Sequence, residues 1–170
     1  MRRTRFDDWP CPIARATDLI GDWWTPLVMR ELFYGRRRFD EIAESLQVPR
    51  AVLTARLNRL VDEGMITKVA YQERPVRHEY RLTEKGLAFG DVLLAMWRWA
   101  ADWQWPEGDG PTVGLKSKAT GEYVDPVVVD EHTGERTTMR TVRLARARAT
   151  AAEPTPTPTL RQAEVPSTTE

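Results

Sequence analysis

Cysteine and histidine are scarce in this chain, which has one cysteine, Cys11, and two histidines, His78 and His132. One cysteine excludes an internal disulfide. Structural zinc takes four ligands, most of them thiolates, so this set of residues is too small for such a site. No nucleophile, phosphate-binding loop or metal-ligand set surrounds either histidine, and Cys11 has no evident histidine partner. We therefore expect no metal, no cofactor and no enzymatic activity.

The chain also has no excess of one charge and no long apolar run. Its 25 basic and 25 acidic residues give a formal net charge of zero, so any contact with nucleic acid must come from local placement of basic residues. Charges interrupt each apolar stretch well short of a membrane span, and residues 1–8 lack the apolar run of a signal peptide. Together with the lone cysteine, these features predict a cytoplasmic, nucleoid-associated protein with no membrane partner.

Aromatic residues are unevenly distributed, because all seven tryptophans lie within the first 105 residues. A compact core or a subunit interface uses such side chains, so we place the main folded domain at residues 9–105, after an N-terminal arm at residues 1–8. Residues 106–111 have the composition of a linker. Residues 112–148 alternate short valine-rich runs with two Thr-Gly-Glu turns, which predicts a small appendage of two β-hairpins. Residues 149–170 are rich in proline and threonine and are predicted to form a disordered tail.

Periodicity within residues 9–105 predicts a mainly α fold with a small β component. The first helix is expected to begin at Pro12, which needs no N–H partner there, and Asp40 is expected to cap the third. Two segments rich in β-forming residues flank a basic loop. The expected helices cover residues 12–20, 24–33, 40–46 and 50–63, the expected strands cover residues 65–71 and 77–82, and a last helix follows Thr83. This order is that of a winged helix-turn-helix, an α+β fold.

The helix expected at residues 50–63 has two unlike sides. Leu53, Leu57 and Leu60 fall within a narrow arc at 3.6 residues per turn. The opposite side carries small and hydrogen-bonding side chains, which let a helix approach base-pair edges closely. Taken alone, the pattern also fits an amphipathic packing helix with a solvated face. The motifs before and after it favour DNA recognition.

Within this helix, Thr54 and Asn58 are suited to base edges, whereas Arg56 and Arg59 are expected to bind phosphates. The loop between the strands is expected to approach the minor-groove edge. The arginine run at residues 36–38 fits a solvated surface and a clamp on the DNA backbone equally well. The residues expected to contact DNA are Arg38, Arg50, Ala51, Thr54, Ala55, Arg56, Asn58, Arg59, Arg74 and Arg77.

The last helix is apolar on several sides, so more than one of its faces must be covered. The rest of a small domain can cover one face, and a second copy of the same helix is the most economical cover for another, which predicts a homodimer. A ligand pocket lined by tryptophans between the subunits is the less common alternative. The residues expected at the dimer interface are Ile13, Trp23, Phe89, Leu93, Met96, Trp97 and Trp103.

Short segments of residues 9–103 match one known family in order and spacing. They are Cys11-Pro12-Ile13-Ala14, Ile20-Gly21-Asp22-Trp23-Trp24-Thr25, Arg30-Glu31-Leu32, Arg38-Phe39-Asp40-Glu41, Leu53-Thr54-Ala55-Arg56-Leu57, Tyr80-Arg81-Leu82-Thr83 and Lys85-Gly86. As an ordered set, these segments resemble the HxlR-type helix-turn-helix regulators, relatives of the MarR group. The resemblance implies a dimer of winged helices, joined mainly by the first and last helices, that acts as a repressor or an activator. By position, it implies that residues 50–60 form the recognition helix and residues 74–77 the wing.

The resemblance also bears on the predicted appendage and on Cys11. Some members of the family have a miniature zinc ribbon with cysteine pairs where residues 112–148 lie. This chain has no cysteine there, so the hairpin shape is expected without its metal. Most free cysteines are small, buried and inert, which is one expectation for Cys11, whereas the resemblance implies a sensor of oxidants or electrophiles at this position. A helix N-terminus would favour its thiolate, and Asp7 and Asp8 would oppose it.

Two functions of different classes fit this fold. The first is a sequence-specific transcription regulator that binds a palindromic operator as a homodimer and releases it in response to a redox or small-molecule signal. The second is an interaction module that dimerises without binding DNA. A regulator needs basic and hydrogen-bonding groups on the exposed side of residues 50–63 and on the wing, whereas a scaffold needs an apolar patch there. The chain has the first pattern, so we expect double-stranded DNA, a second copy and an unidentified effector as partners.

Overall fold

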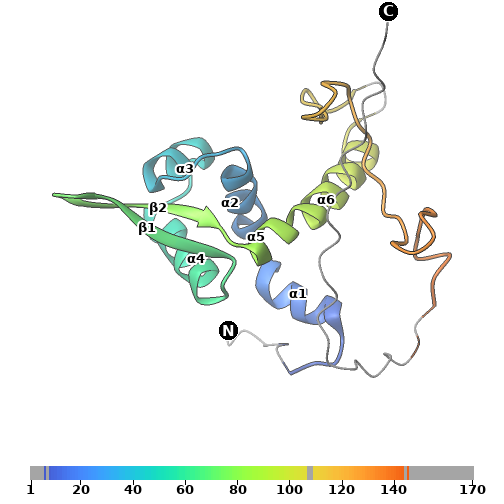
Figure 1. Cartoon of the computed structure of the whole chain (residues 1–170), viewed down its shortest axis with the longest axis horizontal. Coiled ribbons are helices and arrows are strands. Elements are labelled where there is room, and N and C mark those ends of the chain that lie inside the picture. Colours follow the sequence, from blue (N-terminus) through green and yellow to red (C-terminus); the bar gives the residue numbers. More distant parts are fainter. Residues whose placement is uncertain (1–5, 7, 107–108, 144, 146–170) are drawn as a thin grey trace, which may run out of the picture. The chain divides into compact units, whose positions relative to one another are not determined.

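The computed structural model describes residue 6, residues 8–106, residues 109–143 and residue 145 of the chain. Its contacts divide the chain into two units, residues 1–128 and residues 129–170. The predicted disordered tail at residues 149–170 and most of the predicted N-terminal arm lie outside the described residues. All the labelled helices and strands of Figure 1 belong to the first unit.

The first unit has a mainly α fold with one two-stranded sheet (Figure 1). In chain order its elements are α1 (Pro12–Ile20), α2 (Trp24–Phe33), α3 (Phe39–Leu46), α4 (Arg50–Asp62), β1 (Ile66–Glu73), β2 (Val76–Leu82), α5 (Glu84–Ala88) and α6 (Gly90–Trp103). Helices α3 and α4, with the turn between them, form the helix-turn-helix, and β1 and β2 form the wing. The predicted fold class is therefore confirmed.

The start of α3 differs from the prediction. Arg38, and not Asp40, immediately precedes the helix. The carboxylate of Glu41 accepts the backbone N–H groups of Arg37 at 3.1 Å and Arg38 at 3.0 Å. A carboxylate in the first turn that reaches back to these N–H groups is one half of a capping box. The prediction that Asp40 caps this helix is wrong, because Glu41 already occupies that role and Asp40 lies within the first turn.

The predicted last helix is in fact two helices, α5 and α6, which meet at Phe89. Helix α5 lies close to the wing: a Cβ atom at Gly86 would be 2.0 Å from the carbonyl oxygen of Met65. Helix α6 begins close to α2, because a Cβ atom at Gly90 would be 3.1 Å from the ring of Phe33. Gly86 therefore allows a backbone approach that any larger residue would obstruct, whereas a Cβ atom at Gly90 would require the Phe33 ring to shift by a few tenths of an ångström.

The hydrophobic core is built around α4, which contributes Leu53, Leu57 and Leu60 with exposed fractions of 0%, 0% and 1%. Full burial of one such side chain stabilises a fold by about 1.5–3 kcal/mol. The other buried apolar residues of the core are Val28, Met29, Leu32, Ile42, Val48, Met65, Ile66, Tyr80 and Phe89. Because the leucine side of α4 is packed inward, its opposite side lies at the surface, as the sequence predicts.

The wing is an antiparallel hairpin whose register runs from Ile66 opposite Leu82 to Glu73 opposite Val76, with an irregularity between Ala70 and Gln72. The strands extend further than predicted, so only residues 74–75 remain as the turn. The segment before α3 adds to this sheet, because the N–H of Tyr80 donates to the carbonyl of Arg37 at 2.8 Å. This bond connects the base of the wing to the helix-turn-helix.

The chain after α6 contains the same loop twice, once in each unit. Ser117 Oγ accepts the N–H groups of Ala119 and Thr120 at 3.2 Å each, and Gly121 follows with a φ of +75°. In the second unit, the Asp130 carboxylate accepts two N–H groups at 2.9 Å each, and Gly134 follows with a φ of +71°. A positive φ at both positions explains the two glycines.

Each of these loops is closed by a single β-bridge, Lys116 with Tyr123 and Val129 with Arg136. The N–H groups of Thr133 and His132 lower the pKa of the Asp130 carboxyl. Polar side chains therefore satisfy the N–H groups of both loops within the described residues.

Candidate DNA-binding interface

The outer face of α4 is open to solvent. Ala51, Thr54, Ala55 and Asn58 are all exposed in the first unit. Their side chains are short, and the hydroxyl of Thr54 donates to the carbonyl of Arg50 at 2.8 Å. We call these four residues the outer face of α4. A major groove admits an α-helix, and Thr54 and Asn58 give this exposed face its hydrogen-bonding groups.

Arg50 stands at the first position of α4 with 71% of its side chain exposed. Its guanidinium pairs with the carboxylate of Asp40 at 2.9 Å and lies 4.6 Å from the ring centroid of Phe39. An ion pair this exposed contributes about 0–1 kcal/mol, so a DNA phosphate can compete for the guanidinium. The structure therefore leaves Arg50 at the surface beside the outer face of α4.

Arg56 and Arg59 lie in a different environment from the one expected. Each has 25% of its side chain exposed and forms an ion pair within the protein. Arg56 pairs with Asp22 and Arg59 with Asp18, each at 3.2 Å. Sequence reasoning missed both acidic partners, which are 34 and 41 residues away along the chain. Both guanidinium groups are therefore paired with carboxylates of the protein itself, and the expectation that they bind phosphates stays a prediction.

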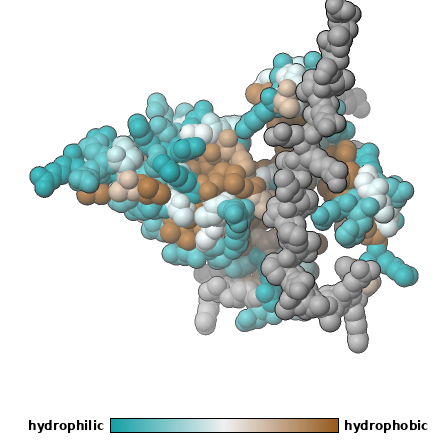
Figure 2. All heavy atoms as spheres, viewed as in Figure 1, coloured by the Kyte–Doolittle hydropathy of each residue, from teal (hydrophilic) through white to brown (hydrophobic). Residues whose placement is uncertain are grey.

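The wing offers its basic residues to solvent. Arg74 at the turn and Arg77 on β2 are exposed. Figure 2 shows that the far end of the hairpin is mainly hydrophilic. Both arginines are therefore accessible from solvent, and the contact of the wing with DNA stays a prediction.

Glu31 holds α2 and α3 together and engages part of the arginine run. This carboxylate is 1% exposed and binds Arg30 at 2.6 Å, Arg36 at 2.8 Å and the hydroxyl of Ser45 at 2.8 Å. Burial alone would raise the pKa of Glu31. Hydrogen bonds from Arg30 and Ser45 and the charges of Arg30 and Arg36 outweigh it and hold that pKa below its ordinary value of 4.5.

The other residues of the arginine run differ from Arg36. Arg38 lies 4.7 Å from the ring centroid of Tyr71 and 3.9 Å from the Glu41 carboxylate, with 56% of its side chain exposed. Arg37 is also exposed. Arg36 therefore has a structural partner, while Arg37 and Arg38 remain at the surface beside the wing.

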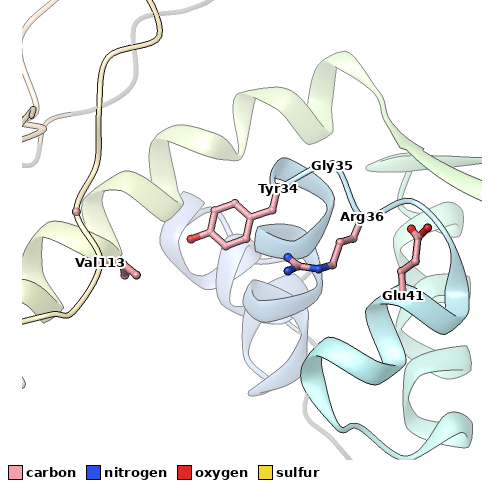
Figure 3. A pocket seen from close by; sticks show the side chains of 6 residues that line it. Tyr34, Gly35, Arg36, Glu41 and Val113 are labelled. Atoms are coloured by element: carbon pink, nitrogen blue, oxygen red, sulfur yellow. The ribbon is translucent and has the colours of Figure 1, made fainter. Parts of the chain in front are cut away.

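A hollow of about 740 Å³ lies at the end of α2 (Figure 3). It is lined by Tyr34, Gly35, Arg36, Glu41, Val113 and Gly114. The charge of Arg36 in this hollow is already paired with Glu31 at 2.8 Å. The hollow was not expected from the sequence, and its lining presents little free polar chemistry for a ligand.

Helix α6 has no buried residue in the described first unit, although most of its side chains are apolar. Trp99 is 59% exposed, Trp103 is 72% exposed and Met96 is 44% exposed. Near α1, Ile13 is 69% exposed and Trp23 is 89% exposed. We use the name α1–α6 apolar surface for these five exposed residues. Sequence reasoning named four of them as interface residues and omitted Trp99 from that set.

The remaining residues expected at the dimer interface are less available. Phe89 is 8% exposed and belongs to the core of the protomer, so its assignment to the interface is wrong. Phe89 lies at the junction of α5 and α6, where its ring packs into the core and not on the outer side of α6. Leu93 packs against the same core, and Trp97 is partly buried.

Cys11 is exposed and directly precedes α1, where its side chain makes no capping hydrogen bond. Its exposure removes the expectation of a buried thiol. Among the described residues, no group of three or more histidine, cysteine, aspartate or glutamate side chains could hold a metal ion. Within the same residues, no helix is both long and apolar enough to span a membrane.

A winged helix-turn-helix with an open recognition helix and a basic wing defines a DNA-binding transcription regulator. Residues 19–107 match the family model described as HxlR-like helix-turn-helix, which covers more than half of the chain. The protein belongs to this family, as the resemblance of its short segments indicated. Members of the family are transcriptional regulators and not enzymes.

Individual relatives agree with this assignment. The chain is 39% identical over 130 residues to the HTH-type transcriptional regulator Rv3095 of Mycobacterium tuberculosis, covering 76% of this chain and 82% of that protein. The solved structure of PA1607, assigned as a transcription factor, is 33% identical with a TM-score of 0.75, covering 85% of this chain and all of that one. The redox regulator HypR in its reduced form is 26% identical with a TM-score of 0.52, covering 55% of this chain and 94% of that one.

Proposed function

We propose that the protein binds a palindromic DNA operator as a homodimer and thereby represses or activates transcription at the nucleoid. Each copy inserts the outer face of α4 into one of two successive major grooves, about 34 Å apart. The observation that carries this proposal is the exposure of Ala51, Thr54, Ala55 and Asn58 on a helix whose opposite side is packed into the core.

The contacts divide into those that select a sequence and those that hold the backbone. Thr54 and Asn58 contact base edges, and the small side chains of Ala51 and Ala55 allow the helix to come close. Exposed cations around this face bind phosphates, which fixes the orientation of the protein but does not select a sequence. These cations are Arg38, Arg50, Arg74 and Arg77.

The α1–α6 apolar surface supports the homodimer. Exposed aromatic and aliphatic side chains on α6, on α1 and just before α2 are typical of a subunit interface. A second copy that presents the same surface would cover both sets of side chains through one two-fold axis. The two-fold axis would also relate the two α4 helices and explain an operator with inverted symmetry.

Selection of bound sequences from a random DNA pool tests the proposal. The purified protein is expected to enrich an imperfect inverted repeat whose half-sites are about one helical turn apart. Asn58→Ala is then expected to lose discrimination at one base pair of each half-site, by about 1–3 kcal/mol. The matched control is Lys118→Ala, an exposed polar residue outside the winged fold, which is expected to enrich the same repeat as the unaltered protein.

Failure to enrich any sequence would contradict the proposal. It would favour the alternative class, an interaction module that dimerises without binding DNA. The outer face of α4 argues against that class, because it has no large apolar side chain with which to dock a protein partner.

A redox signal acting at Cys11 is a second part of the proposal, favoured by exposure of the thiol and by similarity to the redox regulator HypR. With one cysteine per chain, a disulfide can form only between Cys11 of two copies. When the two thiols are oxidised to this disulfide, diamide would accept two protons and two electrons. A quinone would instead be attacked directly by a thiolate, which would form a covalent adduct.

Treatment with diamide or a quinone is expected to release DNA from the unaltered protein and not from Cys11→Ser. Release from Cys11→Ser to the same extent would end the idea that this cysteine is the sensor. Binding of operator DNA before treatment is measured in the same titration, so loss of the DNA-binding function itself would be evident.

A further inference from the structure

We propose that Arg56 and Arg59 are positioning residues that fix the recognition helix α4 to α1 and to the start of α2, and that neither contacts DNA. The inference rests on the proposed operator-binding function and assigns these two side chains a different role within it. Both arginines lie on the side of α4 that faces the first two helices, away from Thr54 and Asn58.

Arg59 connects α4 to the last turns of α1. Its Nη2 donates to the backbone carbonyl of Asp18 at 2.7 Å and lies 3.2 Å from the carboxylate of the same residue. Asp18 is 7% exposed, so the pair is largely shielded from solvent. Glu63 lies 3.9 Å from the same guanidinium group. The positive charge of Arg59 is therefore surrounded by acidic groups and a carbonyl of the protein itself.

Arg56 connects α4 to the start of α2 through Asp22. The Asp22 carboxylate accepts the N–H groups of Trp24 and Thr25 at 2.9 Å each, and the Thr25 hydroxyl at 2.6 Å. Its second oxygen also accepts the Nη1 group of Arg56 at 3.2 Å. One carboxylate thus orders the first turn of α2 and binds the middle of α4, while the Arg56 Nε is enclosed by protein atoms.

These two ion pairs join α4 to α1 and to the segment just before α2. The same two segments carry Ile13 and Trp23 of the α1–α6 apolar surface, which are 69% and 89% exposed. Together with the buried leucines of α4, the pairs Asp18–Arg59 and Asp22–Arg56 therefore set the position of α4 relative to the dimer axis. A dimer places two recognition helices at one spacing on DNA, so a change in either pair is expected to alter operator affinity without a lost DNA contact.

The positioning role and a phosphate contact predict opposite results for the acidic partner. Asp18→Asn removes the negative charge that pairs with the Arg59 guanidinium and leaves the backbone carbonyl of residue 18 in place. If Arg59 bound a phosphate, loss of this competing charge would leave operator affinity unchanged or increase it. If Arg59 positions α4, the same change weakens operator binding, because the ion pair between α4 and α1 is lost.

The test is a double-mutant cycle on operator affinity, measured by fluorescence anisotropy with a duplex selected by the unaltered protein. The variants are Asp18→Asn, Arg59→Gln and the double variant, with the same design for Asp22→Asn and Arg56→Gln. Each single variant is expected to bind the operator about 5- to 150-fold more weakly than the unaltered protein. Each double variant is expected to have an operator affinity no lower than that of the single variant with the lower affinity.

The salt dependence of binding separates positioning from a phosphate contact. Each lost phosphate contact lowers the slope of log affinity against log salt concentration by about 0.9. Arg56→Gln and Arg59→Gln are expected to keep the slope of the unaltered protein. The charge-matched control is Arg136→Gln, which removes an exposed arginine of the second unit and is expected to keep both affinity and slope.

Thermal unfolding of every variant ensures that affinity is measured on folded protein, and Arg59→Lys tests whether a conserved charge restores part of the affinity. Additive losses in the cycles, or a slope lowered by about 0.9 in Arg56→Gln or Arg59→Gln, would overturn the positioning role. In that case the unaltered protein still binds its operator and the proposed function stands. Absence of any selected operator would instead contradict the proposed function.

Discussion

Replacing Trp103 with alanine should weaken the dimer strongly. The residue lies at the end of α6 and is 72% exposed in the described first unit. A tryptophan can bury up to about 250 Å², so that fraction corresponds to about 180 Å² and, at 25 cal/mol per Å², to an upper bound of about 4.5 kcal/mol per copy. A two-fold interface contains the residue twice. Even one third of the combined amount, about 3 kcal/mol, weakens dimerisation more than 100-fold.

Sedimentation velocity over a concentration series measures this change directly. The matched control is Met139→Ala, since Met139 is 79% exposed and lies in the second unit, and its dimer constant is expected to equal that of the unaltered protein. A Trp103→Ala protein that dimerises as tightly as the unaltered protein would refute the assignment of this surface to the interface. Chemical denaturation is expected to show little change in protomer stability, because the side chain is exposed in the protomer.

Three further predictions concern the protomer and its wing. Glu31→Gln should lower the free energy of unfolding by about 1–3 kcal/mol above pH 4.5, because the charged Glu31 stabilises the folded state there. In the unaltered protein this contribution is lost as the pH falls through the lowered folded-state pKa of Glu31. Urea unfolding between about pH 3 and pH 7 measures the difference, and equal pH dependence in both proteins would contradict the prediction. Gly86→Ala should destabilise the fold by about 2 kcal/mol or more, because its Cβ would meet the Met65 carbonyl at 2.0 Å. The control is Gly110→Ala, which should leave the unfolding midpoint unchanged because nothing lies within 4 Å of that Cβ. Arg74→Ala should weaken binding to all DNA sequences about equally and lower the salt slope by about 0.9, so an altered sequence preference would argue against its phosphate role.

The sequence was sufficient for the parts of the fold that depend on local chemistry. Leucines three and four residues apart in residues 53–60 predicted which side of α4 is buried, and Pro12 marked the start of α1. The side of α4 left exposed followed from the same periodicity. These features depend on spacing along one element, so a single sequence contains them.

Features that depend on distant partners could not be predicted. Asp22 and Arg56 are 34 residues apart, and nothing in their local surroundings indicates that they pair. Phe89 looked like one more apolar residue of a long helix. The structure instead divides this helix at Phe89 and includes the ring in the core of the protomer. Helical spacing alone does not distinguish a residue that faces its own core from one that faces a partner.

Hydroxyl-radical footprinting on a selected operator tests the central claim most directly, because it maps backbone protection at nucleotide resolution on both strands. The account predicts two protected patches of equal strength, related by two-fold symmetry and separated by about 10 base pairs. It also predicts weaker protection next to both patches in Arg74→Ala. One asymmetric patch at saturating protein, or uniform protection along the duplex, would contradict the binding of two α4 helices to successive major grooves.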